Sequence, residues 1–243
     1  MCREIVDFLY NKRKNHFDRQ IKAISIANMY HDDLDKEAVI LLQAIINENR
    51  YSIEGLTYLL SLIHPMTPHQ WLTSNKPMLV FASISMGRKI GDSNNLASII
   101  KPLSSLCVLY KEFDNIGDMV SKISIKSPQK ALYESLCGSK DDSYKKHIGL
   151  SRYIPVLSRN KDSAGLGLWN KIDAWELCIP YTPKLISSCI DLGVIDVKSK
   201  HKKRDIRKWL MSLDKTDPFK YIPILDDTNP TYQLKKMGYI IGA

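Results

Sequence analysis

The stretch DLDKEAVILLQAIINEN, residues 33–49, carries the clearest structural signal in this chain of 243 residues. Its apolar side chains recur at intervals of three and four residues, at Leu34, Ala38, Leu41, Leu42, Ile45 and Ile46. This spacing places them on one face of an α-helix, and the acidic residues at the start suit the positive end of the helix dipole. The stretch therefore predicts an amphipathic helix with one buried face.

Helix boundaries are marked by a hydroxyl residue followed by proline. The three instances are Thr67-Pro68, Ser127-Pro128 and Thr182-Pro183. The hydroxyl can accept a first-turn N–H, and proline at the first helical position has no N–H to leave unsatisfied. Glycine follows the second and third instances after about ten residues, at Gly138 and Gly193, where it can end a helix in the left-handed conformation. Two helices with defined ends are therefore predicted, over 127–137 and 182–192.

The rest of the chain also favours helices over strands. Further predicted helices cover 3–28, 53–64, 94–113 with a restart or kink at Pro102, 169–178 and 202–213. The best strand candidates are 77–86, 120–126 and 221–225, and none has an Asn-Gly or Asp-Gly hairpin turn beside it. We expect a mainly α-helical fold with at most a few short strands. It would form an N-terminal helical lobe over 1–125 and a basic C-terminal helical lobe over 126–243, or one continuous domain.

Composition excludes several classes of protein. With 44% apolar and 25% charged residues the chain is not intrinsically disordered, and no apolar run is long enough to cross a membrane. The N-terminus carries Arg3, Glu4 and Asp7 where a signal peptide needs apolar residues. The five cysteines are widely spaced and form no CxxC motif, which favours reduced thiols. A cytoplasmic protein without a membrane partner is expected, and its frequent Ile, Lys, Asn and Tyr suit a virus or phage, in host cytoplasm or virion.

Positive charge is concentrated in one segment. The net charge of the chain is +9, and residues 198–208, KSKHKKRDIRK, hold seven basic side chains against the single acidic Asp205. This segment supplies +6 of the total, and Trp209 follows it directly. Such a cluster can bind a phosphate backbone by displacing condensed counterions, and an aromatic ring nearby offers a stacking surface for a base. The segment is therefore the strongest functional signal in the sequence.

Two further basic groups contain aromatic residues. One spans 140–161 and includes Tyr144 and Tyr153, and the other spans 12–22. We take all three groups together as the candidate nucleic-acid-binding residues: Lys198, Lys200, Lys202, Lys203, Arg204, Arg207, Lys208, Trp209, Lys145, Lys146, Arg152, Tyr153, Lys12, Arg13, Lys14 and Arg19. The alternative is that these charges form solvated helix faces, with Trp209 in an ordinary buried stripe beside Ile206 and Leu210.

Catalytic motifs are weak. Asp191, Asp196 and Lys198 superficially match the acidic residues and lysine of a metal-dependent nuclease, but a helix ends within the motif. Asp196 is better explained as a cap for the following basic helix. His64 and His69 flank two prolines and have no third metal ligand nearby. No cofactor and no metal site are therefore expected.

The leading hypothesis is a non-enzymatic protein that binds RNA or single-stranded DNA, such as a viral or phage nucleoprotein or packaging protein. One alternative is a structural or assembly subunit of a virion or replication complex, whose basic patches meet acidic protein surfaces. The other is the metal-dependent nuclease. The apolar C-terminal end and the N-terminal helix could also pack on a neighbouring copy, which would produce a homo-oligomer.

Overall fold

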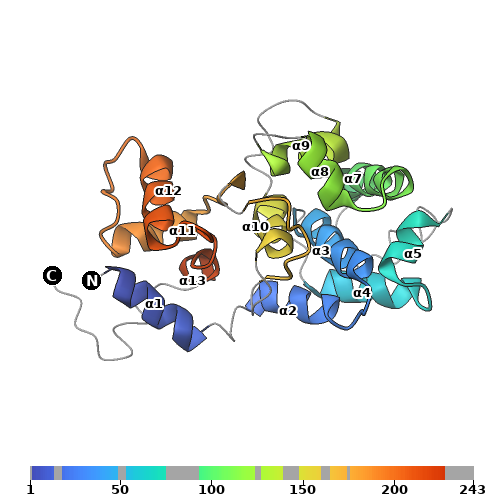
Figure 1. Cartoon of the computed structure of the whole chain (residues 1–243), viewed down its shortest axis with the longest axis horizontal. Coiled ribbons are helices and arrows are strands. Elements are labelled where there is room, and N and C mark those ends of the chain that lie inside the picture. The colour runs from blue at the N-terminus through green and yellow to red at the C-terminus, as the bar shows by residue number, and fades with distance from the viewer. Residues whose placement is uncertain are drawn as a thin grey trace.

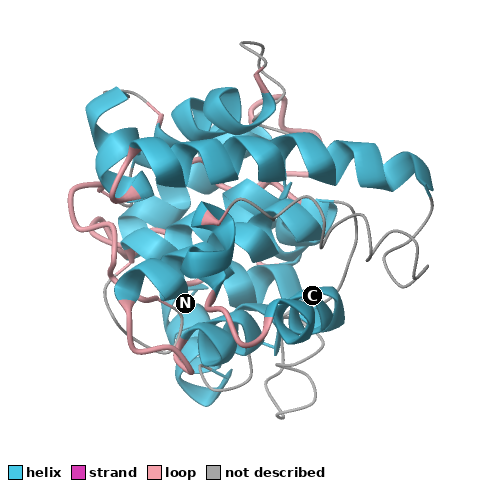
Figure 2. Ribbon diagram, turned by 90° about the vertical axis from the view of Figure 1, so that its right-hand side faces the viewer, coloured by secondary structure: helices cyan, strands magenta, loops and turns pink. Residues whose placement is uncertain are grey.

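The structure is a computed structural model that describes residues 2–13, 18–48, 53–74, 93–123, 127–138, 148–159, 165–173 and 176–227. These residues form twelve helices, labelled α1–α5 and α7–α13 (Figure 1). Helices dominate the perpendicular view as well (Figure 2). The predicted mainly α-helical, multi-helix fold is confirmed. None of the described helices is long and apolar enough to span a lipid bilayer.

The helix predicted over 33–49 is the centre of the larger group of helices. It forms α3 (Asp33–Glu48), and every residue from Glu37 to Ile46 is buried. Burial therefore extends all around the helix, beyond the single apolar face that the spacing predicted, because neighbours cover it on several sides. Those neighbours are α2 (Asp18–Ala27), α4 (Ile53–Ile63), α5 (Pro68–Thr73), α7 (Ser93–Glu112) and α10 (Ile148–Ser158).

All three hydroxyl–proline signals are confirmed as helix starts. The side chains of Thr67, Ser127 and Thr182 each accept the backbone N–H three residues later, at 3.4, 3.4 and 3.1 Å. They begin α5, α9 (Pro128–Cys137) and α11 (Pro183–Asp191) respectively. Gly138 at φ +67° ends α9, and Gly193 at φ +69° lies just beyond α11. Local capping chemistry was therefore sufficient to locate these ends.

Two long helices differ from their predictions. The predicted helix 3–28 is divided into α1 (Cys2–Arg13) and α2, with residues 14–17 outside the described part of the chain. In contrast, α7 continues through Pro102, so the helix does not restart there. Proline removes one helical hydrogen bond. Burial of Leu103 and Leu106 immediately after it compensates for that loss.

Four other predictions concern short segments. The strand predicted over 120–126 is wrong, since residues up to 123 belong to α8 (Ile116–Ile123), and so is the strand over 221–225, which lies mostly in α13 (Ile222–Asp227). Periodicity cannot separate a buried helix from a strand over so few residues. The helix predicted over 169–178 is absent from its described residues, which form turns. The strand candidate 77–86 lies outside the described residues.

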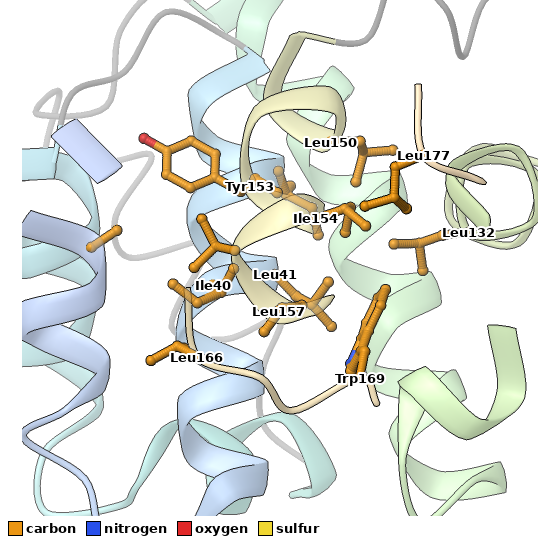
Figure 3. Packing of buried hydrophobic residues seen from close by; sticks show 14 of the residues in the cluster. Ile40, Leu41, Leu132, Leu150, Tyr153, Ile154, Leu157, Leu166, Trp169 and Leu177 are labelled. Atoms are coloured by element: carbon orange, nitrogen blue, oxygen red, sulfur yellow. The ribbon is translucent and has the colours of Figure 1, made fainter. Parts of the chain in front are cut away.

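The core is built mainly where α10 lies against α3. Figure 3 shows side chains from the two helices interdigitating: Ile40 and Leu41 from α3, and Tyr153, Ile154 and Leu157 from α10. Other labelled members come from α9 and from the segments that follow α10. The predicted lobe boundary falls at residues 124–126, which are not described, and α3 and α10 lie on opposite sides of it in the sequence. The division into two lobes stays a prediction.

The least exposed of the described acidic and basic residues is Glu37, on α3. Glu37 is 1% exposed, and its carboxylate accepts four hydrogen bonds. The donors are the Trp169 indole N–H at 2.5 Å, the Tyr110 hydroxyl at 2.9 Å, and the backbone N–H groups of Gly117 at 3.1 Å and Ile116 at 3.4 Å. The carboxylate thus joins α3, α7, the first turn of α8 and the segment after α10.

Gly117 allows this arrangement sterically. A Cβ atom at this position would lie only 2.4 Å from Cδ1 of Trp169, closer than side chains approach one another. Only glycine lets the indole close over the first turn of α8 and reach Glu37. The positive end of α8 also faces the carboxylate, which favours its negative charge.

A second group of helices contains α1, α11, α12 (Lys202–Leu213) and α13 (Figure 1). The first and last described helices meet there. The Tyr221 hydroxyl donates to the Asp7 carboxylate, and the Tyr10 and Tyr221 rings meet edge to face with centroids 5.7 Å apart. The Lys220 ammonium lies 4.9 Å and 5.4 Å from the two ring centroids. These contacts attach the N-terminal helix to α13.

Glu37→Leu tests the role of the buried carboxylate. We expect it to lower the free energy of unfolding by about 4 kcal/mol, because it leaves four buried donors without an acceptor. Glu37→Gln, which keeps one acceptor oxygen, should lower it by about 1–2 kcal/mol. Urea denaturation measures both. Equal stability of Glu37→Leu and the wild type would contradict the assigned role.

The pH dependence of stability provides a separate test. Burial raises the pKa of the Glu37 carboxyl, and the four donors act in the opposite direction without cancelling the effect. A group whose pKa is raised by folding stabilises the folded state when it is protonated. For Glu37 this stabilisation is fully present below the unfolded pKa of about 4.3, and it is lost as the pH rises through the folded pKa. Relative to Glu37→Gln, the wild type should therefore lose stability as the pH rises above about 4.3. A pH-independent difference between the two would refute this.

Candidate nucleic-acid interface

The basic segment forms α12 and the loop before it. The predicted bounds 202–213 are confirmed, since α12 spans Lys202–Leu213. Ile206, Leu210 and Leu213 form its buried stripe, and Arg204 and Lys208 lie exposed on the opposite side. With 3.6 residues per turn, positions four apart share one side of a helix, so these two cations form an outward row.

The loop before α12 presents two further lysines. Asp196 accepts the backbone N–H of Lys198 at 2.6 Å, and Ser199 Oγ accepts the N–H of His201 at 3.1 Å. The Ser199 hydroxyl also hydrogen-bonds Asp205 Oδ2 at 3.1 Å. These local turns leave Lys198 and Lys200 exposed. The loop lies at one end of the long axis of the molecule (Figure 1).

We define the α12 surface as Lys198, Lys200, Lys202, Arg204 and Lys208. Lys202 is half-buried and the other four are exposed. In the described part of the chain, no acidic side chain forms an ion pair with any of the four lysines. Arg204 pairs with Asp205 at 3.4 Å, and its side chain is 60% exposed, so this pair contributes little stability. The surface therefore carries an almost uncompensated positive charge.

The two remaining cations of the segment have internal contacts. The Lys203 ammonium lies 5.4 Å from the centroid of the Tyr181 ring, and Arg207 Nη1 donates to the Leu177 carbonyl at 3.3 Å. Burial raises the pKa of Tyr181 to about 12, and the nearby Arg207 acts against that rise. Lys203 and Arg207 thus hold α12 against residues 177–181. Sequence reasoning missed Tyr181, because no local pattern shows which ring a lysine will cover.

Residues 177–182 are in turn anchored to the core. Gln129 on α9 bonds the Cys178 backbone twice, accepting its N–H at 2.8 Å and donating to its carbonyl at 3.3 Å. Leu177 is buried, and Figure 3 shows it beside Leu150 and Leu132. The contacts that orient α12 are therefore connected to the packing of the core through residues 177 and 178.

The two described cations of the second predicted basic group, Arg152 and Arg159, each form an ion pair within the fold. Arg152 Nη2 donates to Asp226 Oδ2 at 2.6 Å, and Arg159 Nε donates to Asp217 Oδ2 at 2.8 Å. Arg152 lies on α10 and Arg159 directly follows this helix. Their ion pairs therefore tie α10 to α13 and to the segment just before it. Tyr153 is 1% exposed, and no base can stack on a ring buried to this extent. The structure therefore places Arg152 and Tyr153 in structural contacts. Lys145 and Lys146 lie outside the described residues.

The first basic group lies apart from α12. Lys12 and Arg13 are at the end of α1 and Arg19 is at the start of α2, whereas Lys14 lies outside the described residues. In Figure 1, α11 and α13 lie between α1 and α12.

The acidic and histidine candidates have local structural contacts. Asp196 shapes the turn at Lys198, and the N-cap of α12 is His201, so the expected capping of that helix by Asp196 is not observed. Asp35, at the start of α3, accepts the backbone N–H of His69 at 2.9 Å. Among the described residues, no three His, Cys, Asp or Glu side chains are grouped so that they could hold a metal ion.

Comparison of the chain with protein-family models, curated proteins and solved structures finds no match.

Arg152→Gln tests the structural assignment of the second basic group. The change leaves Asp226, which is 5% exposed, without its cation, and we expect the free energy of unfolding to fall by about 3 kcal/mol. Polyanion binding by the folded variant should be unchanged. Urea denaturation and a binding titration measure the two effects. Lost affinity at unchanged stability would instead place Arg152 in the interface.

Proposed function

We propose that this protein binds nucleic acid through the phosphate backbone, using the α12 surface. The observation that carries the proposal is the set of lysines at one end of the molecule that no described acidic side chain neutralises. Concentrated charge of one sign is unfavourable for a folded chain by itself. A polyanion relieves this repulsion, and it gains binding free energy from released counterions.

The geometry suits a row of phosphates. Arg204 and Lys208 are separated by four residues, which corresponds to about 6 Å along the helix axis. Lys198 and Lys200 extend the charge beyond the start of the helix. Lysine acts as a flexible point charge, which suits contacts to phosphates without sequence selectivity. The proposal is therefore backbone recognition, with no base-specific readout assigned to these residues.

The number of cations sets the expected salt dependence. If all five members of the α12 surface contact phosphates, the logarithm of the binding constant for a single strand should fall with the logarithm of salt concentration with a slope of about −3.5. Each contact then supplies roughly fivefold in affinity at 0.1 M salt. Binding should therefore be strong at low salt and weak at high salt.

The combined change Lys200→Gln and Lys208→Gln tests this directly. We expect affinity for a labelled single-stranded 12-mer to fall roughly 25-fold at 0.1 M salt, and the magnitude of the slope to fall by about 1.4. Fluorescence anisotropy over a salt series gives both quantities.

The matched control removes two exposed lysines elsewhere, Lys101→Gln on α7 and Lys122→Gln on α8. It changes the net charge equally and should leave affinity within about twofold. Equal losses in the two variants would show that binding follows total charge, and would contradict a site at α12.

A further inference from the structure

Trp209 differs from the other tryptophans that the structure describes. Trp71 and Trp169 are buried, at 0% and 2% exposure, and the Trp169 indole N–H donates to Glu37. Trp209 is half-buried and packs partly against the core. None of the described residues forms a hydrogen bond, ring contact or cation–π contact with its indole. Part of a large aromatic ring therefore faces solvent without a specific contact.

Its position on α12 relates this ring to the phosphate-binding row. Trp209 follows Lys208 directly, and successive residues are about 100° apart around a helix. It therefore flanks the outward row of Arg204 and Lys208, on the side opposite Lys203 and Arg207. Lys202 is seven residues earlier, which places it about two turns away on the same side. A strand whose phosphates follow the outward row would thus have Trp209 at its edge.

The other aromatic residues near this region have different environments. Tyr181 is also half-buried, but its ring lies under the Lys203 ammonium. Tyr153 is inside the core. Of Tyr153, Tyr181 and Trp209, Trp209 alone combines partial exposure, cationic neighbours and a ring not covered by another described residue.

We infer that the α12 surface takes single-stranded nucleic acid and that an unpaired base stacks on Trp209. This inference rests on the proposed function and specifies its substrate class. In a duplex the faces of the bases are covered by their neighbours, whereas a single strand can turn a base toward an aromatic ring. Stacking tolerates all four bases, so it adds affinity without sequence readout.

The full chain is tested with three labelled probes of equal phosphate number: a 12-mer of thymidylate, a 12-mer abasic phosphodiester chain and a hairpin duplex. We expect the thymidylate strand to bind roughly 5-fold to 100-fold more tightly than the abasic chain at equal salt, because only the former can stack. The duplex should show charge-dependent binding only, without the gain from stacking.

Two substitutions locate the effect at Trp209. Trp209→Leu should remove most of the preference for thymidylate over the abasic chain, and Trp209→Phe should retain part of it. The salt slope should be unchanged in both, since no cation is removed. Thymidylate should also quench tryptophan fluorescence in the wild type, and this quenching should be lost in Trp209→Phe.

The outcomes separate this inference from the proposed function. Equal binding of thymidylate and abasic chains by the wild type overturns the stacking inference and leaves backbone binding intact, and that comparison requires no variant to fold. Absence of binding to every probe at low salt overturns both. Polyglutamate of equal charge serves as a fourth probe, and if it binds as tightly as thymidylate, an acidic protein surface is the partner and both proposals are wrong.

Discussion

The buried carboxylate of Glu37 imposes the strongest constraint on this fold, because a charged group inside a core must be matched by donors. Its four hydrogen bonds join α3, α7, the start of α8 and Trp169. The segment containing Trp169 is also bonded to α10, because the backbone N–H of Trp169 donates to the Leu157 carbonyl at 2.9 Å. A polar contact inside the core thus links α3, α7 and α8 and, through Trp169, α10.

Contacts extend from this core to the candidate interface. Leu177 is part of the core, Gln129 holds the adjacent Cys178 backbone, and Arg207 reaches the Leu177 carbonyl from α12. The seven cations of residues 198–208 therefore have two roles. Lys203 and Arg207 contact the rest of the fold, and the remaining five are the proposed contacts to a partner. A count of basic residues does not separate these two roles. Substitution in the first pair is expected to affect the fold, whereas substitution among the other five is expected to affect binding.

Sequence patterns predicted the features that depend on neighbouring residues. Helix starts at Ser127 and Thr182 follow from a hydroxyl and a proline side by side, and the buried stripe of α12 follows from the spacing of Ile206 and Leu210. Features that depend on distant residues were missed. Arg152 looked like a phosphate ligand because its partner, Asp226, is 74 residues away. No local sequence pattern indicated that Glu37 would be buried, since the residues that bond to it are up to 132 positions away.

The most direct test of the central claim, that the α12 surface binds nucleic acid, is the absorbance spectrum of the full chain purified from cells at low ionic strength. The account predicts a 260/280 nm ratio well above that of protein alone, which falls to the protein value after a wash in high salt or digestion with nuclease. Lys200→Gln combined with Lys208→Gln should lower the initial ratio. The claim would be contradicted if the wild-type protein showed the spectrum of protein alone at low salt and also bound no added oligonucleotide.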